Sequence, residues 1–181
     1  MSQPPEARSS ADVTIRACSP SDAEALALVG RATFLESYAE VLPGADILAH
    51  CAAQHAPELY ASWLAREDHG LWIAEAAGGA PVGYVTLNPP DLPVETGPGD
   101  VEIKRIYLLS RYHGAGLGAE LLTAARSGAA VRGFERILLG VFSKNAQAIG
   151  FYRRQGFAQV GVRQFQVGAN LYDDLVLARP V

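Results

Sequence analysis

The sequence predicts an α+β fold, in which a mixed and mostly antiparallel central sheet of about seven strands has a βαβ core and flanking helices. Three observations lead to this prediction. Apolar residues recur at helical spacing between residues 20 and 66, paired β-rich runs follow up to residue 109, and a glycine-rich turn then opens an alternation of helices and strands. With 181 residues, of which 49% are hydrophobic, the chain can bury a core of its own.

Composition and charge exclude several classes of protein. The chain has 15 basic and 19 acidic residues, a formal net charge of -4, and therefore no basic stripe for nucleic acid and no polybasic membrane patch. The first ten residues, MSQPPEARSS, lack the apolar run of a signal peptide. We therefore expect a cytoplasmic protein with no nucleic-acid or membrane partner, and a homodimer is left open.

The chain is expected to begin with a flexible N-terminal tail, residues 1–11, and to continue as a single domain, residues 12–181. The tail is polar and contains prolines, whereas Val13–Arg16 alternate as in a first strand. Because no repeat and no change of composition marks a linker, one domain is predicted.

Two or three helices are predicted after the first strand. Ser19 is a good helix cap, and Pro20 suits an early helical position. Pro43 and Pro57 interrupt the helical pattern that follows, because proline removes a backbone donor and clashes with the preceding turn. Residues 20–66 are therefore divided into separate helices.

A β-hairpin is predicted next, from residues 71–75 and 82–87, which are joined by a turn that contains Gly78 and Gly79. Residues 88–100 hold four of the chain's 11 prolines and cannot form regular structure, so they are expected to line a site as a long loop. The remaining elements are predicted as a strand at 101–109, a helix at 116–131, a strand at 135–142, a helix at 145–155 and strands at 157–167 and 171–178.

Three alternating glycines, Gly114, Gly116 and Gly118, connect the strand at 101–109 to an amphipathic helix. Glycine permits positive φ and close approach of the backbone to a phosphate, and the first N–H groups of a helix lack internal partners. The turn therefore predicts an anion site, with a tight connection that serves packing alone as the alternative. The apolar face of the helix is assigned to Leu117, Leu121, Ala124 and Val131.

Asn145 and Tyr152 are seven residues apart on the next predicted helix, which ends at Gly156. That separation brings both residues to one helix face, about 10 Å apart, so that an extended ligand could contact each of them. Taken alone, the helix favours Asn145 as a helix cap and Tyr152 as a core aromatic with its hydroxyl satisfied locally.

The two segments together resemble motifs A and B of the GNAT (Gcn5-related) N-acetyltransferases. In that family (Arg/Gln)-x-x-Gly-x-(Gly/Ala) binds the pyrophosphate of acetyl-CoA. Residues 111–116, which begin with Arg111, satisfy this pattern, but the preferred register places Gly118 last and His113 at the Arg/Gln position. The run Asn145–Phe157 is similar to motif B. The resemblance implies a GNAT fold, acetyl-CoA as co-substrate and a pyrophosphate held by His113, Gly114, Ala115, Gly116, Leu117 and Gly118.

The resemblance also implies roles along the rest of the cofactor. Asn145 would contact the pantetheine or the phosphates, and Tyr152 would protonate the departing thiolate. Main-chain groups of Ile106, Tyr107 and Leu108 would bind the pantetheine and thioester, and an N–H near Leu108 is the candidate for the oxyanion. His113 as a catalytic base is the weaker alternative.

Glu102 is the candidate for the general base, acting directly or through a water, with a solvated ion pair to Lys104 as the alternative. Regular alternation would put Glu102, Lys104 and Ile106 on one face of the strand and Ile103, Arg105 and Tyr107 on the other. The acceptor pocket is expected to draw on Phe34, Glu36, Tyr38, Glu40, Tyr84 and Glu95.

The predicted reaction is acetylation of a primary amine of a small molecule by direct transfer in a ternary complex. Ile103–Leu108, Leu139–Phe142 and the C-terminal strands are similar to bacterial spermine/spermidine-type acetyltransferases, which suggests a polyamine. The alternatives are a protein or peptide N-acetyltransferase and a non-catalytic acyl-CoA-binding module. No metal site is predicted, and Cys51 as an acyl-accepting nucleophile is a remote alternative because its neighbours in sequence supply no base.

Overall fold

The computed structural model describes residues 12–167 and 170–181, so the predicted tail at residues 1–11 lies outside the described residues. The elements follow in this order: β1 (Val13–Ala17), η2 (Pro20–Asp22), α1 (Ala23–Tyr38), α2 (Gly44–Gln54), α3 (Pro57–Leu64), β2 (Gly70–Ala76), β3 (Pro81–Asn88), β4 (Asp100–Leu108), η3 (Ser110–Tyr112), α4 (Leu117–Val131), β5 (Arg136–Phe142), α5 (Ala146–Arg154), β6 (Ala158–Val167) and β7 (Asn170–Pro180).

The seven strands form one sheet in the order β1-β2-β3-β4-β5-β7-β6. Only β4 and β5 run parallel, and they are the two strands that α4 connects. The other neighbouring strands are antiparallel. The predicted fold class is confirmed: the sheet is mixed and mostly antiparallel, with a βαβ unit at its centre.

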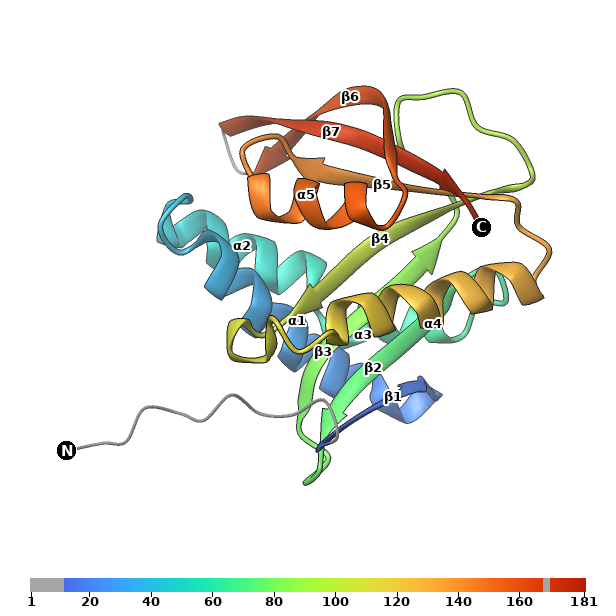
Figure 1. The fold of residues 1–181 in the computed structure, drawn as a ribbon. Coiled ribbons are helices and arrows are strands. Elements are labelled where there is room, and N and C mark those ends of the chain that lie inside the picture. Colours follow the sequence, from blue (N-terminus) through green and yellow to red (C-terminus); the bar gives the residue numbers. More distant parts are fainter. Residues whose placement is uncertain (1–11, 168–169) are drawn as a thin grey trace.

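The helices lie on both faces of the sheet (Figure 1). α1 and α3 pack against the strands β2–β4 on one face, and α4 packs on the opposite face of the same strands. α5 lies on the α4 side and covers β5 (Figure 1). On the other side of β5 and β7, Leu92 and Val94 of the loop after β3 contact Leu138 and Val176. Both faces of the sheet are therefore covered by helices, and this loop covers β5 and β7 on the face away from α5.

The start of α1 is fastened to the sheet by charged groups. Asp22 accepts a hydrogen bond from the Ser19 N–H at 2.6 Å, as in a capping box. The Arg16 guanidinium of β1 donates to Asp22 and to Glu75 of β2, each at 2.8 Å. The Arg16 guanidinium is the main cause that holds the pKa of Asp22 well below its usual range.

The packed face of α4 differs from the predicted one. Leu117 and Leu121 are buried as expected, but Val131 is 89% exposed and Ala124 is only half-buried. Residue 131 is ten positions after Leu121 and lies about 80° round the helix from it. The buried stripe consists instead of Leu117, Leu121, Leu122, Ala125 and Ala129.

A β-bulge in β4 makes the predicted alternation along this strand wrong. Thr86 pairs with Arg105 and Leu87 pairs with Ile103, so Lys104 is an extra residue without a partner on β3. Ile103 and, beyond the bulge, Ile106 both pack in the core with α4. Glu102 therefore shares a face with Arg105 and Tyr107, toward α1–α3, and not with Ile106.

Candidate active site

The glycine-rich turn lies between η3 and α4. Gly114 and Gly116 have φ values of +83° and +86°, in the left-handed region that favours glycine, and Gly116 is the N-cap of α4. Gly118 has no positive φ, and a Cβ there would lie 3.7 Å from Cζ of Phe151, an ordinary contact. The backbone conformation thus requires glycine at positions 114 and 116.

The turn presents a run of free backbone donors. In residues 12–167 and 170–181, no acceptor is found for the N–H groups of Gly114–Gly118. The first bonded N–H groups are those of Ala119 and Glu120, which donate to the Gly116 carbonyl at 2.9 and 3.1 Å. Successive N–H groups in such a turn, together with the positive end of the α4 dipole, favour a bound anion.

His113 does not extend into this run of donors. Its Nε2 lies 2.8 Å from the carbonyl oxygen of Leu108, the last residue of β4, and because a carbonyl oxygen only accepts, Nε2 is the donor in this contact. The imidazole thereby fastens the turn to the end of β4. Sequence reasoning placed His113 beside the phosphates, and this contact had no sequence signal.

The strands β4 and β5 separate in the middle of the sheet. They pair only over Asp100–Ile103 and Arg136–Leu139, and their later residues diverge (Figure 1). The Leu109 N–H donates to the Val82 carbonyl of β3 at 2.9 Å. Main-chain groups alternate in an antiparallel ladder, so every second residue of this part of β4 turns its N–H and C=O away from β3.

The alternation shows which main-chain groups of β4 face β3 and which face the gap. Counting back from Leu109, the groups of Tyr107 face β3, and those of Ile106 and Leu108 face the gap between β4 and β5. Among the three predicted residues, Ile106 can therefore pair with an extended ligand through both main-chain groups, and Leu108 can do so through its N–H, since its carbonyl accepts from His113. Tyr107 contributes its side chain, which lies on the α1–α3 face.

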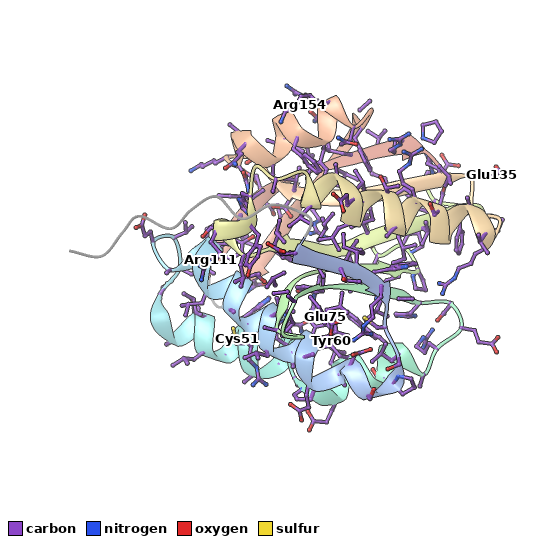
Figure 2. All side chains as sticks on the ribbon, turned by 60° about the horizontal axis from the view of Figure 1, so that its bottom comes forward. Cys51, Tyr60, Glu75, Arg111, Glu135 and Arg154 are labelled. Atoms are coloured by element: carbon purple, nitrogen blue, oxygen red, sulfur yellow. The ribbon has the colours of Figure 1, made fainter. Side chains whose placement is uncertain are left out.

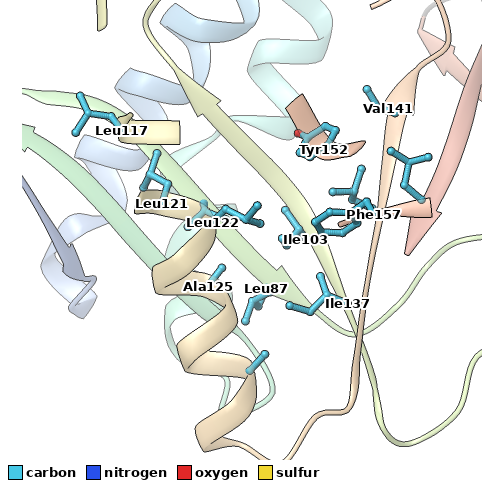
Figure 3. Close-up of a cluster of buried hydrophobic side chains, with 14 of the residues drawn as sticks. Leu87, Ile103, Leu117, Leu121, Leu122, Ala125, Ile137, Val141, Tyr152 and Phe157 are labelled. Atoms are coloured by element: carbon cyan, nitrogen blue, oxygen red, sulfur yellow. The ribbon is translucent and has the colours of Figure 1, made fainter. Parts of the chain in front are cut away.

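Tyr152 lies at the edge of the core, with its hydroxyl directed toward β4 (Figure 3). Burial raises the pKa of this hydroxyl, and Tyr107 adds to the effect. The phenol is therefore protonated at neutral pH. Within the described part of the chain, its hydroxyl has no hydrogen-bond partner. It can donate to a group in the gap between β4 and β5.

Asn145 is the N-cap of α5, where its Oδ1 accepts a hydrogen bond from the Ala148 N–H at 3.0 Å. The capping role is the structural alternative that the sequence indicated for Asn145. The side chain is exposed, and its amide group still has two donors for a ligand at this end of the helix.

Glu102 is only 1% exposed. One carboxylate oxygen accepts from the Asp91 N–H at 2.7 Å, and the other lies 3.8 Å from Nζ of Lys104. The alternative of a solvated carboxylate is therefore wrong, although the Lys104 contact exists. Glu102 fastens the loop after β3 to β4, on the face that it shares with Tyr107.

A groove of about 670 Å³ lies between the loop after β3 and the β6–β7 hairpin. In its wall, Asp174 is 5% exposed and accepts from the Arg163 guanidinium at 3.0 Å. Burial raises the pKa of Asp174, and Arg163 opposes this. The groove residues, which sequence reasoning missed, are Pro93, Ser143, Val162, Arg163, Gln164, Asp173, Asp174 and Leu175.

Two tyrosines connect the groove to β4. The hydroxyls of Tyr38 and Tyr107 interact, and the neighbouring Tyr107 together with burial raises the pKa of Tyr38. Asp174 acts electrostatically on both. Tyr107 also acts electrostatically on Tyr152, so the two hydroxyls are close enough for Tyr107 to raise the pKa of Tyr152.

The α1–α3 face of β4 carries a buried guanidinium. Arg105 is 9% exposed, donates from Nη1 to the Tyr60 hydroxyl at 2.9 Å and from Nη2 to Oε1 of Gln54 at 3.4 Å. Its Cζ lies 4.7 Å from the centre of the Trp63 ring. Figure 2 labels Tyr60 among the side chains between the sheet and these helices.

Two histidines of α2 and its C-terminal end lie close to this guanidinium. His55 Nδ1 is 2.9 Å from the Tyr60 hydroxyl, and His50 stacks on Phe34 with ring centres 4.1 Å apart. Burial, aided by the charge of Arg105, lowers the pKa of His50 to about 4 and that of His55 to about 3. Both rings are therefore neutral at neutral pH.

Of the other residues predicted to line the acceptor pocket, two make structural hydrogen bonds and two are exposed. Glu36 accepts from the N–H and the hydroxyl of Ser110, each at 2.9 Å, and so connects α1 to η3. Tyr84 is completely buried, and its hydroxyl accepts from Tyr60 at 3.3 Å. Glu40 and Glu95 are exposed.

Cys51 is partly buried, and burial raises the pKa of its thiol, which is the opposite of what a nucleophile needs. In the ranges 12–167 and 170–181, no group of three or more His, Cys, Asp or Glu side chains could hold a metal ion. The same residues include no helix of sufficient length and hydrophobicity to cross a membrane.

Comparison with known proteins identifies the family and the fold. The sequence model of the "Acetyltransferase (GNAT) family" matches residues 34–157. An N-acetyltransferase of Mycobacterium tuberculosis, itself uncharacterised, is 32% identical over 158 residues, which cover 87% of this chain and 97% of that protein. The L-methionine sulfoximine/L-methionine sulfone acetyltransferase of Pseudomonas aeruginosa is 33% identical over 104 residues, 58% of this chain and 59% of that one. The paiA N-acetyltransferase of Thermoplasma acidophilum, solved with coenzyme A, has a TM-score of 0.76 at 21% identity and covers 93% of this chain and 99% of its own.

Proposed function

This chain belongs to the GNAT family of acetyltransferases, and we propose that it transfers the acetyl group of acetyl-CoA directly to a primary amine of a small molecule in a ternary complex. Its class, an acetyl-CoA-dependent N-acetyltransferase, follows from the family. The observation that carries the proposal is the continuous path from the free N–H groups of Gly114–Gly118 to the open edge of β4 at Ile106 and Leu108.

The proposed cofactor site has two parts. The pyrophosphate of acetyl-CoA accepts hydrogen bonds from the N–H groups of Gly114, Ala115, Gly116, Leu117 and Gly118, since a backbone cradle at a helix N-terminus suits this anion. The pantetheine follows the unpaired edge of β4, with Asn145 at the entrance to α5. His113 acts by holding the turn on Leu108.

Tyr152 is the proposed acid for the departing thiolate. Its raised pKa keeps it protonated, and its hydroxyl is directed toward β4, where the thioester is expected. A thiol has an ordinary pKa of about 8.5, so the leaving thiolate can accept a proton from a nearby phenol. The Leu108 N–H, which faces the gap, is the proposed donor to the oxyanion.

Glu102 is the proposed general base, acting through a water. It shares a face of β4 with Tyr107, and its second carboxylate oxygen accepts no hydrogen bond from another described residue. An ammonium acceptor must lose a proton before it can attack, and a carboxylate on this face can receive it.

The groove beside Asp173 and Asp174 favours a cationic amine as the acceptor, since two carboxylates face one guanidinium there. A polyamine remains a prediction, and so does a homodimer. Among the relatives, the Pseudomonas aeruginosa enzyme is named for amino-acid analogues. We therefore include both polyamines and amino acids among the acceptors to be tested.

The test is release of free thiol from acetyl-CoA with a panel of small amines, one N-terminal peptide and no acceptor as a control. Thiol release with a small amine is expected, and Glu102→Gln should lower it most at acidic pH, where the acceptor is most protonated. Release only with the peptide would favour a protein N-acetyltransferase. No release with any amine, although acetyl-CoA raises the melting temperature, would contradict the proposed reaction.

A further inference from the structure

Arg105 is a buried cation without an anionic partner. It is 9% exposed, and no carboxylate in the described part of the chain lies within ion-pair distance of it. Its partners, Tyr60 and Gln54, are neutral. A buried charge is costly unless an opposite charge and hydrogen bonds compensate for it.

The guanidinium is held so that its donors remain available. A guanidinium has five N–H donors, and the bonds to Tyr60 and Gln54 use two, which leaves three. Stacking on Trp63, at 4.7 Å, occupies a face of the group and not its N–H edges. Gln54 is exposed, so the Nη2 end of the guanidinium lies toward the surface.

The side chains packed around Arg105 from α2 and α3, and Tyr107 beside it on β4, carry no negative charge, and the carboxylate of Glu102 on the same face is not in ion-pair contact with it. His50 and His55, the nearest titratable groups of α2 and its C-terminal end, are neutral at neutral pH because burial lowers the pKa of each. Tyr60 and Tyr107 remain protonated because burial raises the pKa of each. None of these neighbours therefore neutralises the charge of the guanidinium.

Two further polar groups on the same face have no partner. Thr86 pairs with Arg105 across the strands, and Thr86 and Asn88 share the α1–α3 face of β3 with Tyr84. Thr86 Oγ1 and Asn88 Oδ1 are buried without a hydrogen bond in the residues that the structure describes. Buried polar atoms are normally satisfied, so this part of the sheet is suited to a polar ligand.

Arg105 also lies close to the proposed position of the acetyl group. Arg105 and Tyr107 are two residues apart on one face of β4, beyond the bulge, and are therefore about 7 Å apart along the strand. The main-chain groups of Ile106 and Leu108 flank Tyr107 on the side of the gap. An acceptor with its amine at the gap can reach Arg105 with a second group.

From this juxtaposition we propose that the acceptor amine carries a carboxylate, which the Arg105 guanidinium binds while the amine faces the thioester; the acceptor is thus an amino acid rather than a polyamine. The inference rests on the proposed acetyltransferase function. A planar guanidinium suits a carboxylate because two parallel N–H groups can bind its two oxygens.

The test compares each acceptor that has a carboxylate with its own carboxamide, which lacks the charge, and with a polyamine. Thiol release from acetyl-CoA is measured with the proteinogenic L-amino acids, with 3-aminopropanoate and 4-aminobutanoate, with the carboxamide of each, and with spermidine. For the preferred acceptor, kcat/KM is expected to exceed that of its carboxamide about 100-fold, because the carboxamide leaves the buried cation unpaired.

Arg105→Gln is expected to reduce the acid-to-carboxamide ratio of kcat/KM to near one, mainly through the KM of the acid. Arg105→Lys should restore part of the ratio, since it keeps the charge but loses the planar pair of donors. Arg66→Gln is the matched control, because Arg66 is an exposed arginine whose partners among the described residues are its neighbours Asp68 and His69. The melting temperature of each variant is measured alongside.

The outcomes separate the two proposals. Equal or higher kcat/KM for the carboxamides or for spermidine would overturn the carboxylate inference and leave the acetyltransferase function standing. An unchanged ratio in a folded Arg105→Gln enzyme would do the same. Absence of thiol release with every small amine would overturn both. Should Arg105→Gln not fold, the wild-type ratio decides, together with Thr86→Val, which is expected to raise KM for the acid and not for its carboxamide.

Discussion

The turn at Gly114–Gly118 and the acceptor side around Arg105 and Asp174 lie near the same strand but are made of different parts of the chain. The turn offers main-chain N–H groups from five successive residues. The acceptor side is made of side chains that come from α1, α2, α3, β4, β6 and β7. One half thus depends on a local conformation, and the other depends on tertiary packing.

This difference implies that substitutions act on the two halves in different ways. A backbone donor survives most side-chain changes, so cofactor binding is expected to respond only where a substitution alters φ or fills the turn. A side chain that acts on the reacting groups has no substitute. The variants below compare a catalytic side chain with the main-chain turn and with a region outside the site, from the largest expected effect to the smallest.

The largest effect is expected for Tyr152→Phe. Removal of the proposed acid should lower kcat about 100-fold, while the Kd of acetyl-CoA changes less than about twofold. Steady-state thiol release and calorimetric titration measure the two quantities. Tyr112→Phe, the same change at another core tyrosine, is the control. An unchanged kcat would remove Tyr152 from the acid role.

A smaller effect, on binding alone, is expected for Gly116→Ala. The substitution strains a residue at φ +86° and displaces the donors around it, so the Kd of acetyl-CoA should rise about 10-fold. Gly133→Ala at the other end of α4 imposes the same strain at φ +78°, with no atom within 4 Å of the added Cβ. If both variants bind acetyl-CoA like the wild type, the backbone cradle is wrong.

Asp22→Asn tests a region that neither half of the site uses. Loss of the charge that Arg16 and the Ser19 N–H stabilise should cost about 1–2 kcal/mol of the free energy of unfolding at pH 7. Because the folded-state pKa of Asp22 lies below its usual value, this contribution is complete above pH 5 and is lost as the pH falls below about 4.

Denaturant titration of wild type and Asp22→Asn between pH 7 and pH 2.5 measures this difference. The two proteins should converge in stability as the pH falls, with the Kd of acetyl-CoA equal at pH 7. A constant difference in stability over the whole range would show that the charge of Asp22 is not its cause.

The smallest effect is expected for His113→Ala. The imidazole holds the turn on the Leu108 carbonyl, so its loss should raise the Kd of acetyl-CoA about threefold, with the N–H donors intact. Calorimetric titration at pH 7.5 measures it. A rise of 30-fold or more would mean that His113 binds the phosphates itself, and the contrast between a main-chain turn and a side-chain acceptor site would weaken.

The order and type of the strands and of the helices after residue 100 could be predicted, except for the short η3, because hydrophobic periodicity and proline or glycine boundaries are local signals; between residues 20 and 66 two or three helices were expected, and the structure has three α-helices. The details that failed depend on tertiary structure. The bulge at Lys104 reverses the alternation of β4, and no residue type at that position announces it. Val131 was assigned to the packed face of α4 by its hydrophobicity, but it lies at the solvent side of the last turn.

The candidate site likewise has parts with local sequence signals and parts that depend on tertiary structure. The glycine turn and the helix from Asn145 to Tyr152 could be found from sequence, since each is one continuous segment. The surroundings of Arg105 could not be found from sequence, because its neighbours Gln54 and Tyr60 are more than 40 residues away in the chain. The pair of Arg163 and Asp174 needs the β6–β7 register to be known.

The separation of β4 from β5 has a consequence for handling of the protein. Beyond Ile103, the sheet has a row of backbone donors and acceptors in its interior that no neighbouring strand covers. An uncovered strand edge is a template for pairing with another chain. A ligand that lies along Ile106 and Leu108 acts as a replacement strand, so preparations stored with coenzyme A should aggregate more slowly than preparations stored without it.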